Sequence, residues 1–143
     1  MRPPEGLLFP VPAVSPASIS DNFNDRRGSR THHALDIMAP RHSQVVAVAD
    51  GAIARMMLSD AGGITLYQWS EDRRLVFYYA HLQGYAFGLA EGQPIGRGQV
   101  LGYVGSTGNA PPGAPHLHFG IVEADKEGRW WGGLALNPYQ AWR

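Results

Sequence analysis

The sequence predicts an all-β protein, built mostly from antiparallel strands in a sandwich or barrel. Three observations support this class. The 143 residues include 18 glycines, short apolar segments alternate with turn-forming residues, and no window repeats its apolar residues at helical spacing. Because short strands joined by tight turns need frequent glycine, this combination favours strands along most of the chain.

The predicted strands begin at residue 45. Each is bounded by turn signals such as Asp50-Gly51 and Asp60-Ala61-Gly62-Gly63. The candidates are Val45–Val48, Ala52–Leu58, Ile64–Trp69, Leu75–Ala80, Val100–Val104 and His116–Val122. Asn109–Pro115 is too rich in proline for a regular element, so we expect it to be a loop before the last of these strands.

The proline-rich start of the chain predicts an extended arm. Residues 1–19 contain five prolines, at positions 3, 4, 10, 12 and 16, and proline removes backbone donors. We therefore expect residues 1–19 to lie as an arm on one domain of residues 20–143, which is long enough to bury a core. Ser20–Arg30 is polar and is expected to be a loop.

Composition excludes several classes of protein. Charged residues make up 17% of the chain and the formal net charge is zero, so a nucleic-acid partner has no electrostatic support. No apolar run is long enough to cross a bilayer, and Gly6–Pro10 is too short for the core of a signal peptide. Cysteine is absent, which excludes disulfides and thiolate ligands. Any zinc must therefore be bound by His, Asp or Glu.

The most informative feature is a pair of histidines separated by one residue. His116 and His118 lie in a predicted strand whose intervening residues, Leu117, Phe119 and Ile121, are apolar. Because successive side chains on a strand point to opposite faces, the two imidazoles lie on one face and the apolar residues on the other.

Three residues elsewhere in the chain could join this pair. His32 and Asp36 lie far upstream, and His81 stands alone between the two groups. A catalytic zinc is held by three nitrogen or oxygen ligands and keeps an open fourth position. The five residues can supply such a site and leave two histidines for acid–base work, so the sequence predicts a zinc hydrolase.

Short motifs occur in a fixed order along the chain. They are HHALDIMAP at residues 32–40, Ala49-Asp50-Gly51, Tyr79-Ala80-His81-Leu82, Gly105-Ser106-Thr107-Gly108 followed by Pro115-His116-Leu117-His118-Phe119, and Leu136-Asn137-Pro138. Together they resemble the signature of lysostaphin-type and LytM-type zinc endopeptidases, which cut peptide bonds in peptidoglycan. The resemblance runs from about residue 21 to residue 138. It implies the duplicated hybrid motif fold, a β-sandwich or barrel-like hybrid with long loops around a central groove.

The same resemblance implies a role for five residues. His32, Asp36 and His118 match the zinc (Zn²⁺) ligands, and His81 and His116 match the catalytic pair. One of the pair would take a proton from water while the other stabilises the oxyanion or protonates the leaving amine; the sequence leaves the two roles unassigned. A peptidoglycan peptide as substrate, a periplasmic or extracellular location in the cell envelope, and a monomer are the accompanying expectations.

Some residues near these motifs allow a second interpretation or depart from the family pattern. His33 could equally bind zinc, but the motif register selects His32 and makes His33 a cleft-wall or surface residue. Asn22 is interpreted as a loop residue at the cleft rim. Ala34 stands where related sequences usually carry Gly, and Gly120 stands where many carry Glu, which removes a charge beside the cleft.

Two other functions compete with catalysis. A non-catalytic envelope module that binds peptidoglycan or activates another hydrolase typically loses ligands, and this chain keeps them all. A phosphocarrier does not need the H-x-x-x-D ligand set, and a lipoyl carrier needs a lysine in a tight turn, whereas the single lysine, Lys126, lies between Asp125 and Glu127. We therefore expect a zinc endopeptidase, and we favour stem-peptide cross-links over glycine bridges as its substrate.

Overall fold

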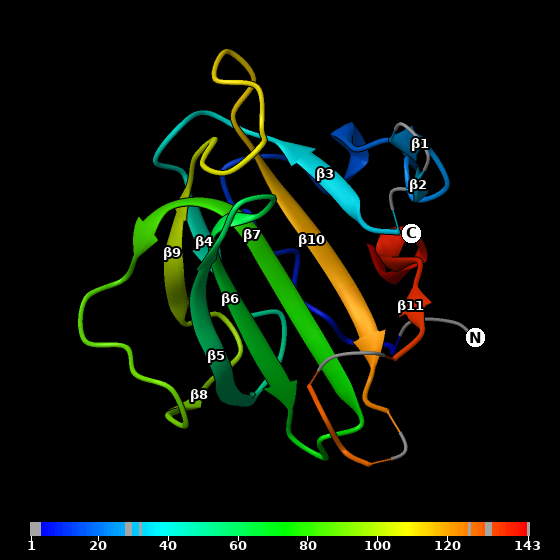
Figure 1. The fold of residues 1–143 in the computed structure, drawn as a ribbon, viewed down its shortest axis with the longest axis vertical. Coiled ribbons are helices and arrows are strands. Elements are labelled where there is room, and N and C mark those ends of the chain that lie inside the picture. Colours follow the sequence, from blue (N-terminus) through cyan, green and yellow to red (C-terminus); the bar gives the residue numbers. More distant parts are fainter. Residues whose placement is uncertain (1–3, 28–29, 32, 126, 131–132, 143) are drawn as a thin grey trace.

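The computed structural model describes residues 4–27, 30–31, 33–125, 127–130 and 133–142 (Figure 1). Eleven strands and two short 3-10 helices lie in this part of the chain. They are η1 (Pro16–Ser18), β1 (Arg26–Arg27), β2 (Arg30–Thr31), β3 (Leu35–Met38), β4 (Gln44–Val46), β5 (Gly51–Ser59), β6 (Gly63–Ser70), β7 (Leu75–Tyr85), β8 (Pro94–Ile95), β9 (Val100–Val104), β10 (His116–Glu123), β11 (Ala135–Leu136) and η2 (Pro138–Trp142). None of the described helices is long and apolar enough to cross a membrane.

Nine of these strands form one antiparallel sheet. Its main path is β11-β10-β7-β6-β5-β8, with β3 beside β10 and with β9 joining the end of β7 to β4. The long strands β5, β6, β7 and β10 lie next to one another in Figure 1, and β1 and β2 pair separately. The expected all-β, mostly antiparallel class is confirmed.

All six strands expected from the sequence correspond to observed strands. The differences between the expected and observed elements are explained by strand pairing and by the shortness of some strands. β7 runs past the expected end at Ala80 to Tyr85, because there it leaves β10 and pairs with β9. The hairpin β1–β2 overlaps Ser20–Arg30, which was expected to be a loop. It and β3 have two to four residues per strand, too few for an alternating pattern to be recognised.

The hydrophobic core lies against the apolar face of β10, which the alternating pattern of the sequence predicted. Leu117, Phe119 and Ile121 are fully buried and pack with residues from β3, β7 and β9. The members of this core from the other strands and loops include Leu35, Ile37, Val45, Ile53, Leu66, Phe77, Tyr79, Leu82, Leu101 and Val104. Because the sheet is anchored on this face, the opposite side of β10 is left for His118.

Residues 4–19 extend across the same core. The backbone N–H of Leu8 donates to the Val48 carbonyl at 2.9 Å, and Val11 is completely buried. Phe9 packs edge-on against Trp142 of η2, with 5.1 Å between ring centroids. The two ends of the chain therefore pack together on the core.

One buried polar network ties the sheet to the β4–β5 connection. The Tyr79 hydroxyl donates to Gln68 Oε1 at 2.7 Å and accepts from the Val48 N–H at 3.1 Å, while Gln68 Nε2 donates to the Ala49 carbonyl at 2.8 Å. Tyr79 and Gln68 are fully buried, and burial raises the pKa of the Tyr79 hydroxyl well above its usual value. Such a network stabilises the fold only while all its members are satisfied.

Replacing Tyr79 with Phe should lower the free energy of unfolding by about 1–3 kcal/mol, because Gln68 Oε1 and the Val48 N–H lose their partner in a dry environment. Chemical denaturation measures this change. Tyr103→Phe on half-exposed β9 is the matched control and should change stability by less than about 0.5 kcal/mol. Equal stability of the wild-type protein and Tyr79→Phe would contradict the role given to this hydroxyl.

Candidate active site

The register of β3 against β10 brings two predicted site residues together. Asp36 lies directly opposite His118, which in turn lies opposite Ala80 of β7. Directly opposed residues on one sheet face have their Cβ atoms about 4.5–5.5 Å apart. Accordingly, His118 Nδ1 lies 3.1 Å from Asp36 Oδ1, although 82 residues separate them in the sequence. Both side chains are about one-fifth exposed.

His116 lies at the first position of β10 and approaches the same carboxylate. Its Nε2 is 3.5 Å from Asp36 Oδ1. Its Nδ1 lies 3.0 Å from the Ala114 carbonyl, and since a carbonyl can only accept, Nδ1 carries the proton. Nε2 is therefore the basic nitrogen, and it is the one that faces Asp36.

His81 closes the other side of the cluster. Its ring centroid is 4.9 Å from that of His116 and 5.6 Å from that of His118. The Nδ1–H donates to the Thr107 carbonyl at 2.7 Å, which again leaves Nε2 as the basic nitrogen. Burial lowers the pKa of His81, and the nearby imidazoles of His116 and His118 lower it further, so its neutral form is favoured.

The backbone of His81 is in the left-handed region, with φ of 61°. A side chain other than glycine costs roughly 1–2 kcal/mol there. The conformation lies where β7 changes partner from β10 to β9, and the His81 N–H donates to the Gly62 carbonyl at 2.8 Å. The change of strand partner thus turns the imidazole toward His116 and His118.

Thr107 is the residue that fixes His81 from the opposite loop. Its Oγ1 donates to the Leu82 carbonyl at 2.8 Å and accepts from the Ile64 N–H at 3.0 Å. The loop can approach this closely because Gly63 and Gly108 meet there: a Cβ on either would lie within 2.6 Å of the other segment's backbone. Both glycines have positive φ, so the Gly-Ser-Thr-Gly motif serves backbone packing as well as His81.

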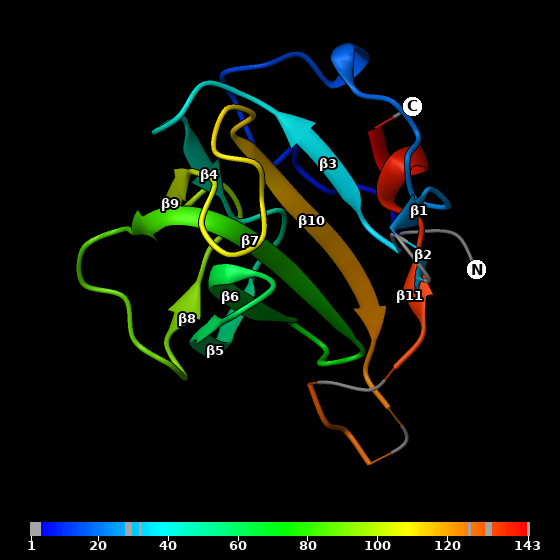
Figure 2. The same cartoon turned by 45° about the horizontal axis from the view of Figure 1, so that its top comes forward.

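The following loop, residues 105–115, is held beside the start of β10 (yellow in Figure 2). Arg41, in the β3–β4 connection, links this loop to β7. Its guanidinium donates to Gln83 Oε1 of β7 at 3.1 Å and to the Pro112 carbonyl of the loop at 2.9 Å. Because Ala114 of this loop accepts from His116, the anchoring by Arg41 also acts on the position of His116.

Four of the five predicted site residues, Asp36, His81, His116 and His118, therefore lie in one cluster. His32, the fifth, lies outside the described residues. The described part of the chain contains no group of three His, Cys, Asp or Glu side chains arranged to hold a metal ion. Asp36 and His118 are thus the two members of the expected ligand set that can be compared with metal geometry.

The spacing between Asp36 and His118 agrees with that of two ligands on one zinc ion. Ligands bound at 2.0–2.1 Å to one tetrahedral zinc lie about 3.3 Å from each other. Asp36 Oδ1 and His118 Nδ1 are 3.1 Å apart, and carboxylate oxygen and imidazole nitrogen are donors that zinc accepts. The donor pair therefore fits a shared zinc ion.

Sequence reasoning gave no role to two residues that orient this cluster. Asn22 was expected to be a loop residue at the cleft rim, and its Oδ1 accepts from the Asp36 N–H at 3.2 Å. Thr107 was recognised only as part of a motif. Each of these two residues contacts a partner at least 14 positions away in the sequence. Only the contact of Asn22 could have been indicated by the sequence, because asparagine side chains often accept from backbone N–H groups.

His33 lies apart from the cluster of Asp36, His81, His116 and His118. Its side chain is exposed, its φ is 59°, and its N–H donates to the Phe23 carbonyl at 2.8 Å. The ring packs against Phe23, with 5.6 Å between centroids. His33 also contributes to a hollow of about 290 Å³ that has His118 at its wall.

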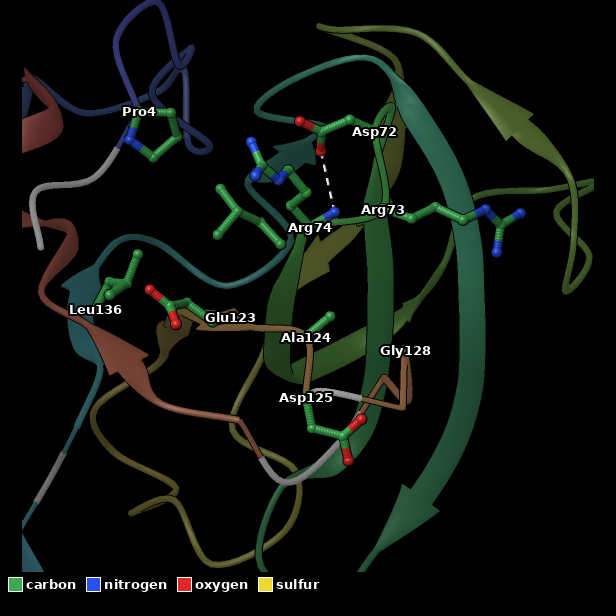
Figure 3. A pocket seen from close by; sticks show the side chains of 10 residues that line it. Pro4, Asp72, Arg73, Arg74, Glu123, Ala124, Asp125, Gly128 and Leu136 are labelled. Atoms are coloured by element: carbon green, nitrogen blue, oxygen red, sulfur yellow. Dashed lines mark hydrogen bonds between the residues drawn. The ribbon is translucent and has the colours of Figure 1, made fainter.

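A larger cavity, of about 580 Å³, lies where β7 begins and β10 ends (Figure 3). Its wall carries charges of both signs, including Asp72, Arg74 and Glu123, and Asp72 accepts from the Arg74 N–H at 3.0 Å. None of the clustered histidines reaches it. The cavity at this end therefore has no part in the candidate active site.

The neighbouring antiparallel strands β3, β7 and β10 thus carry one Asp and three His side chains of the candidate site. The model of Peptidase family M23 matches residues 30–131, which is more than half of the chain. The chain belongs to this family, and the resemblance inferred from the motifs is confirmed.

Individual relatives agree with this assignment. The L-Ala–D-Glu endopeptidase of Bacillus subtilis is 32% identical over 94% of the chain, and the match spans 43% of that protein. Csd3 of Helicobacter pylori superposes with a TM-score of 0.74 at 27% identity, covering 97% of the chain and 33% of Csd3. The catalytic domain of lysostaphin from Staphylococcus simulans gives 0.66 at 27% identity and 77% coverage of both chains. The chain thus spans less than half of the curated relative.

The anchoring by Thr107 predicts the protonation pattern of the His81 ring. Thr107→Val should remove the side-chain bonds to Leu82 and Ile64, loosen the carbonyl that receives the Nδ1–H, and mix the two neutral tautomers. Nitrogen-15 NMR of the imidazole measures their ratio. Thr107→Ser keeps the hydroxyl and should retain the Nδ1–H form, and an unchanged ratio in Thr107→Val would argue against the anchoring role.

Proposed function

We propose that the chain is a zinc-dependent endopeptidase that hydrolyses peptide bonds in peptidoglycan. The observation that carries this proposal is the convergence of Asp36, His118, His116 and His81 from β3, β10 and the bend of β7. Membership of Peptidase family M23 supports the hydrolytic class. The catalytic unit in this proposal is residues 20–143, with residues 1–19 as an arm on it.

Asp36 and His118 would hold the zinc ion, with His32 as the third ligand implied by the family motif. Zinc in a site of this kind provides a nucleophile near neutral pH by lowering the pKa of water to about 7, and it polarises a carbonyl group. The hydrogen bond from the Asp36 N–H to Asn22 orients the carboxylate-bearing strand. Partners of this kind help to keep metal ligands in position.

His81 and His116 would carry the proton transfers. Each has its Nδ1–H bonded to a backbone carbonyl, so each can accept or release a proton only at Nε2. The Nε2 of His116 lies 3.5 Å from Asp36 Oδ1. The lowered pKa of His81 suits a residue that begins as a neutral acceptor. In this scheme one imidazole accepts the proton of water and the other serves the oxyanion or the leaving amine.

The substrate we propose is a peptidoglycan stem peptide. The Bacillus subtilis relative is named for a bond between L-Ala and D-Glu, which supports a bond of the stem peptide over a glycine bridge; that the bond lies in a stem-peptide cross-link stays our proposal. A location in the cell envelope, periplasmic or extracellular, follows from such a substrate. The net charge of zero is consistent with a partner other than nucleic acid.

Substitutions should separate metal binding from proton transfer. His118→Ala should lose both zinc and cleavage of purified sacculi, because it removes a ligand. His81→Ala and His116→Ala should retain zinc while kcat falls by about 10²–10⁴-fold, the range for loss of a general acid or base. Zinc is measured by elemental analysis and cleavage by release of muropeptides.

The exposed His42 provides the matched control for these variants. His42→Ala should retain both zinc and activity. Cleavage by a zinc-free His118→Ala protein would refute the metal assignment. A zinc-loaded wild-type protein that binds sacculi and releases nothing would instead identify a non-catalytic envelope module.

Metal removal tests the same proposal without substitution. Treatment with a chelator should stop the release of muropeptides, and added zinc should restore it. Mass spectrometry of the products identifies the bond: new termini within stem peptides are expected, whereas termini within glycine bridges would contradict the proposed substrate. Release that continues at full rate in the chelator would contradict zinc dependence.

A further inference from the structure

A tyrosine ring that has no part in the proposed chemistry contacts the imidazole of His118. Tyr78 of β7 packs edge-on against His118, with 5.8 Å between ring centroids and 82° between ring planes. His118 is the proposed zinc ligand whose Nδ1 lies 3.1 Å from Asp36 Oδ1. Because the torsion that turns an imidazole has broad minima, the groups packed around the ring decide how firmly Nδ1 is kept toward Asp36.

The strand register explains why these two rings meet. On the paired strands β7 and β10, His118 lies opposite Ala80 and Gly120 lies opposite Tyr78. Residues two apart share a face of a strand, so Tyr78 and His118 are diagonal neighbours, within reach of aromatic side chains. The small residues at positions 80 and 120 leave the space between them free for this contact. A Cβ on Gly120 would already lie 3.7 Å from Tyr78 Cβ and 3.9 Å from its Cδ2.

The ring of Tyr78 is itself held in place. Its hydroxyl lies against Gly62 in the β5–β6 turn, so closely that a Cβ on Gly62 would collide with it. Tyr67, which pairs with Tyr78 across β6 and β7, packs on the ring with 4.6 Å between centroids. Trp130 packs in turn on Tyr67, also at 4.6 Å. A ring in contact at its face and at its hydroxyl end can hold a neighbouring side chain in one orientation.

Two rings flank the position of His118 along β7. His81 lies beyond Ala80 from Tyr78, and its ring centroid is 5.6 Å from that of His118, with 73° between the planes. His81 belongs to the proposed acid–base pair, and its Nδ1–H is bonded to the Thr107 carbonyl. Tyr78 differs, because its hydroxyl lies at the β5–β6 turn and its ring is the part that packs against His118. Any influence of Tyr78 on the site therefore acts through His118.

We propose that Tyr78 is a positioning residue for His118, whose imidazole it holds with Nδ1 toward Asp36 before zinc binds. This inference rests on the proposed function, in which Asp36 and His118 are zinc ligands. A ligand that is already oriented does not have to be ordered when the metal binds, which favours binding. Groups that orient metal ligands in this way strengthen metal affinity although they do not touch the ion.

The zinc affinity of Tyr78 variants tests this role without relying on enzyme activity. Tyr78→Leu removes the ring and should raise the Kd for zinc by roughly 3- to 10-fold, the range that corresponds to one edge-on ring contact. Tyr78→Phe keeps the ring and should bind zinc within about twofold of the wild-type protein. Competition with a chromogenic chelator measures each Kd.

Tyr103→Leu is the matched control. It removes a half-buried ring from β9, which pairs with β4 and β7 and not with β10, and it should leave the Kd for zinc unchanged within about twofold. Chemical denaturation of each metal-free variant gives its free energy of unfolding. A loss of stability in Tyr78→Leu without any change in Kd would show that the ring serves packing alone, and would overturn the positioning role.

Nuclear Overhauser contacts in the wild-type protein provide a second test, which applies even if Tyr78→Leu fails to fold. Ring protons of Tyr78 and His118 should be in contact both in the metal-free protein and after zinc is added, because the imidazole is held in the same orientation in both forms. Absence of these contacts from either form would contradict the proposal.

The outcomes separate this inference from the function on which it rests. A raised Kd in Tyr78→Leu, with Tyr78→Phe and Tyr103→Leu like the wild-type protein, would support the positioning role. A Kd that Tyr78→Leu and Tyr103→Leu raise equally would overturn that role alone. A wild-type protein that binds no zinc would overturn the proposed function and the positioning role with it.

Discussion

The antiparallel register of β3 on β10 is the constraint on which the candidate site depends. It places Asp36 opposite His118, and a shift of one residue would turn one of these side chains to the core face. The fully buried Leu35 and Ile37 on β3, and Leu117 and Phe119 on β10, set this register through hydrophobic burial. Hydrophobic packing below the sheet thus determines which polar side chains meet above it.

The two remaining histidines depend on loops and on a bend in a strand. His81 occupies a left-handed conformation where β7 changes partner, and the Thr107 carbonyl fixes its ring. His116 is fixed by Ala114 in a loop that Arg41 anchors. Rigid strands therefore supply Asp36 and His118, two of the proposed metal ligands, and backbone carbonyls in loops set the tautomers of the proposed acid–base pair. This division agrees with the need for rigid ligands and for defined proton positions.

The sequence was sufficient for the parts of the fold that repeat over several residues. Alternation and turn signals predicted β10 almost to the residue, because Leu117, Phe119 and Ile121 all face the core. Nothing local could predict β3, which has four residues and a partner about 80 positions away. The candidate site residues were predicted from the order of motifs along the chain, whereas the left-handed backbone of His81 arises only from the change of strand partner in the folded sheet.

Crystallography of the zinc-loaded protein, with anomalous scattering at the zinc edge, tests the central claim most directly. We expect one peak at about 2.0–2.2 Å from both Asp36 Oδ1 and His118 Nδ1, with His32 as the third protein ligand. The Nε2 atoms of His81 and His116 should face the open position. A zinc peak held by His33, or one bound between His81 and His116 away from Asp36, would contradict the assignment of the ligands.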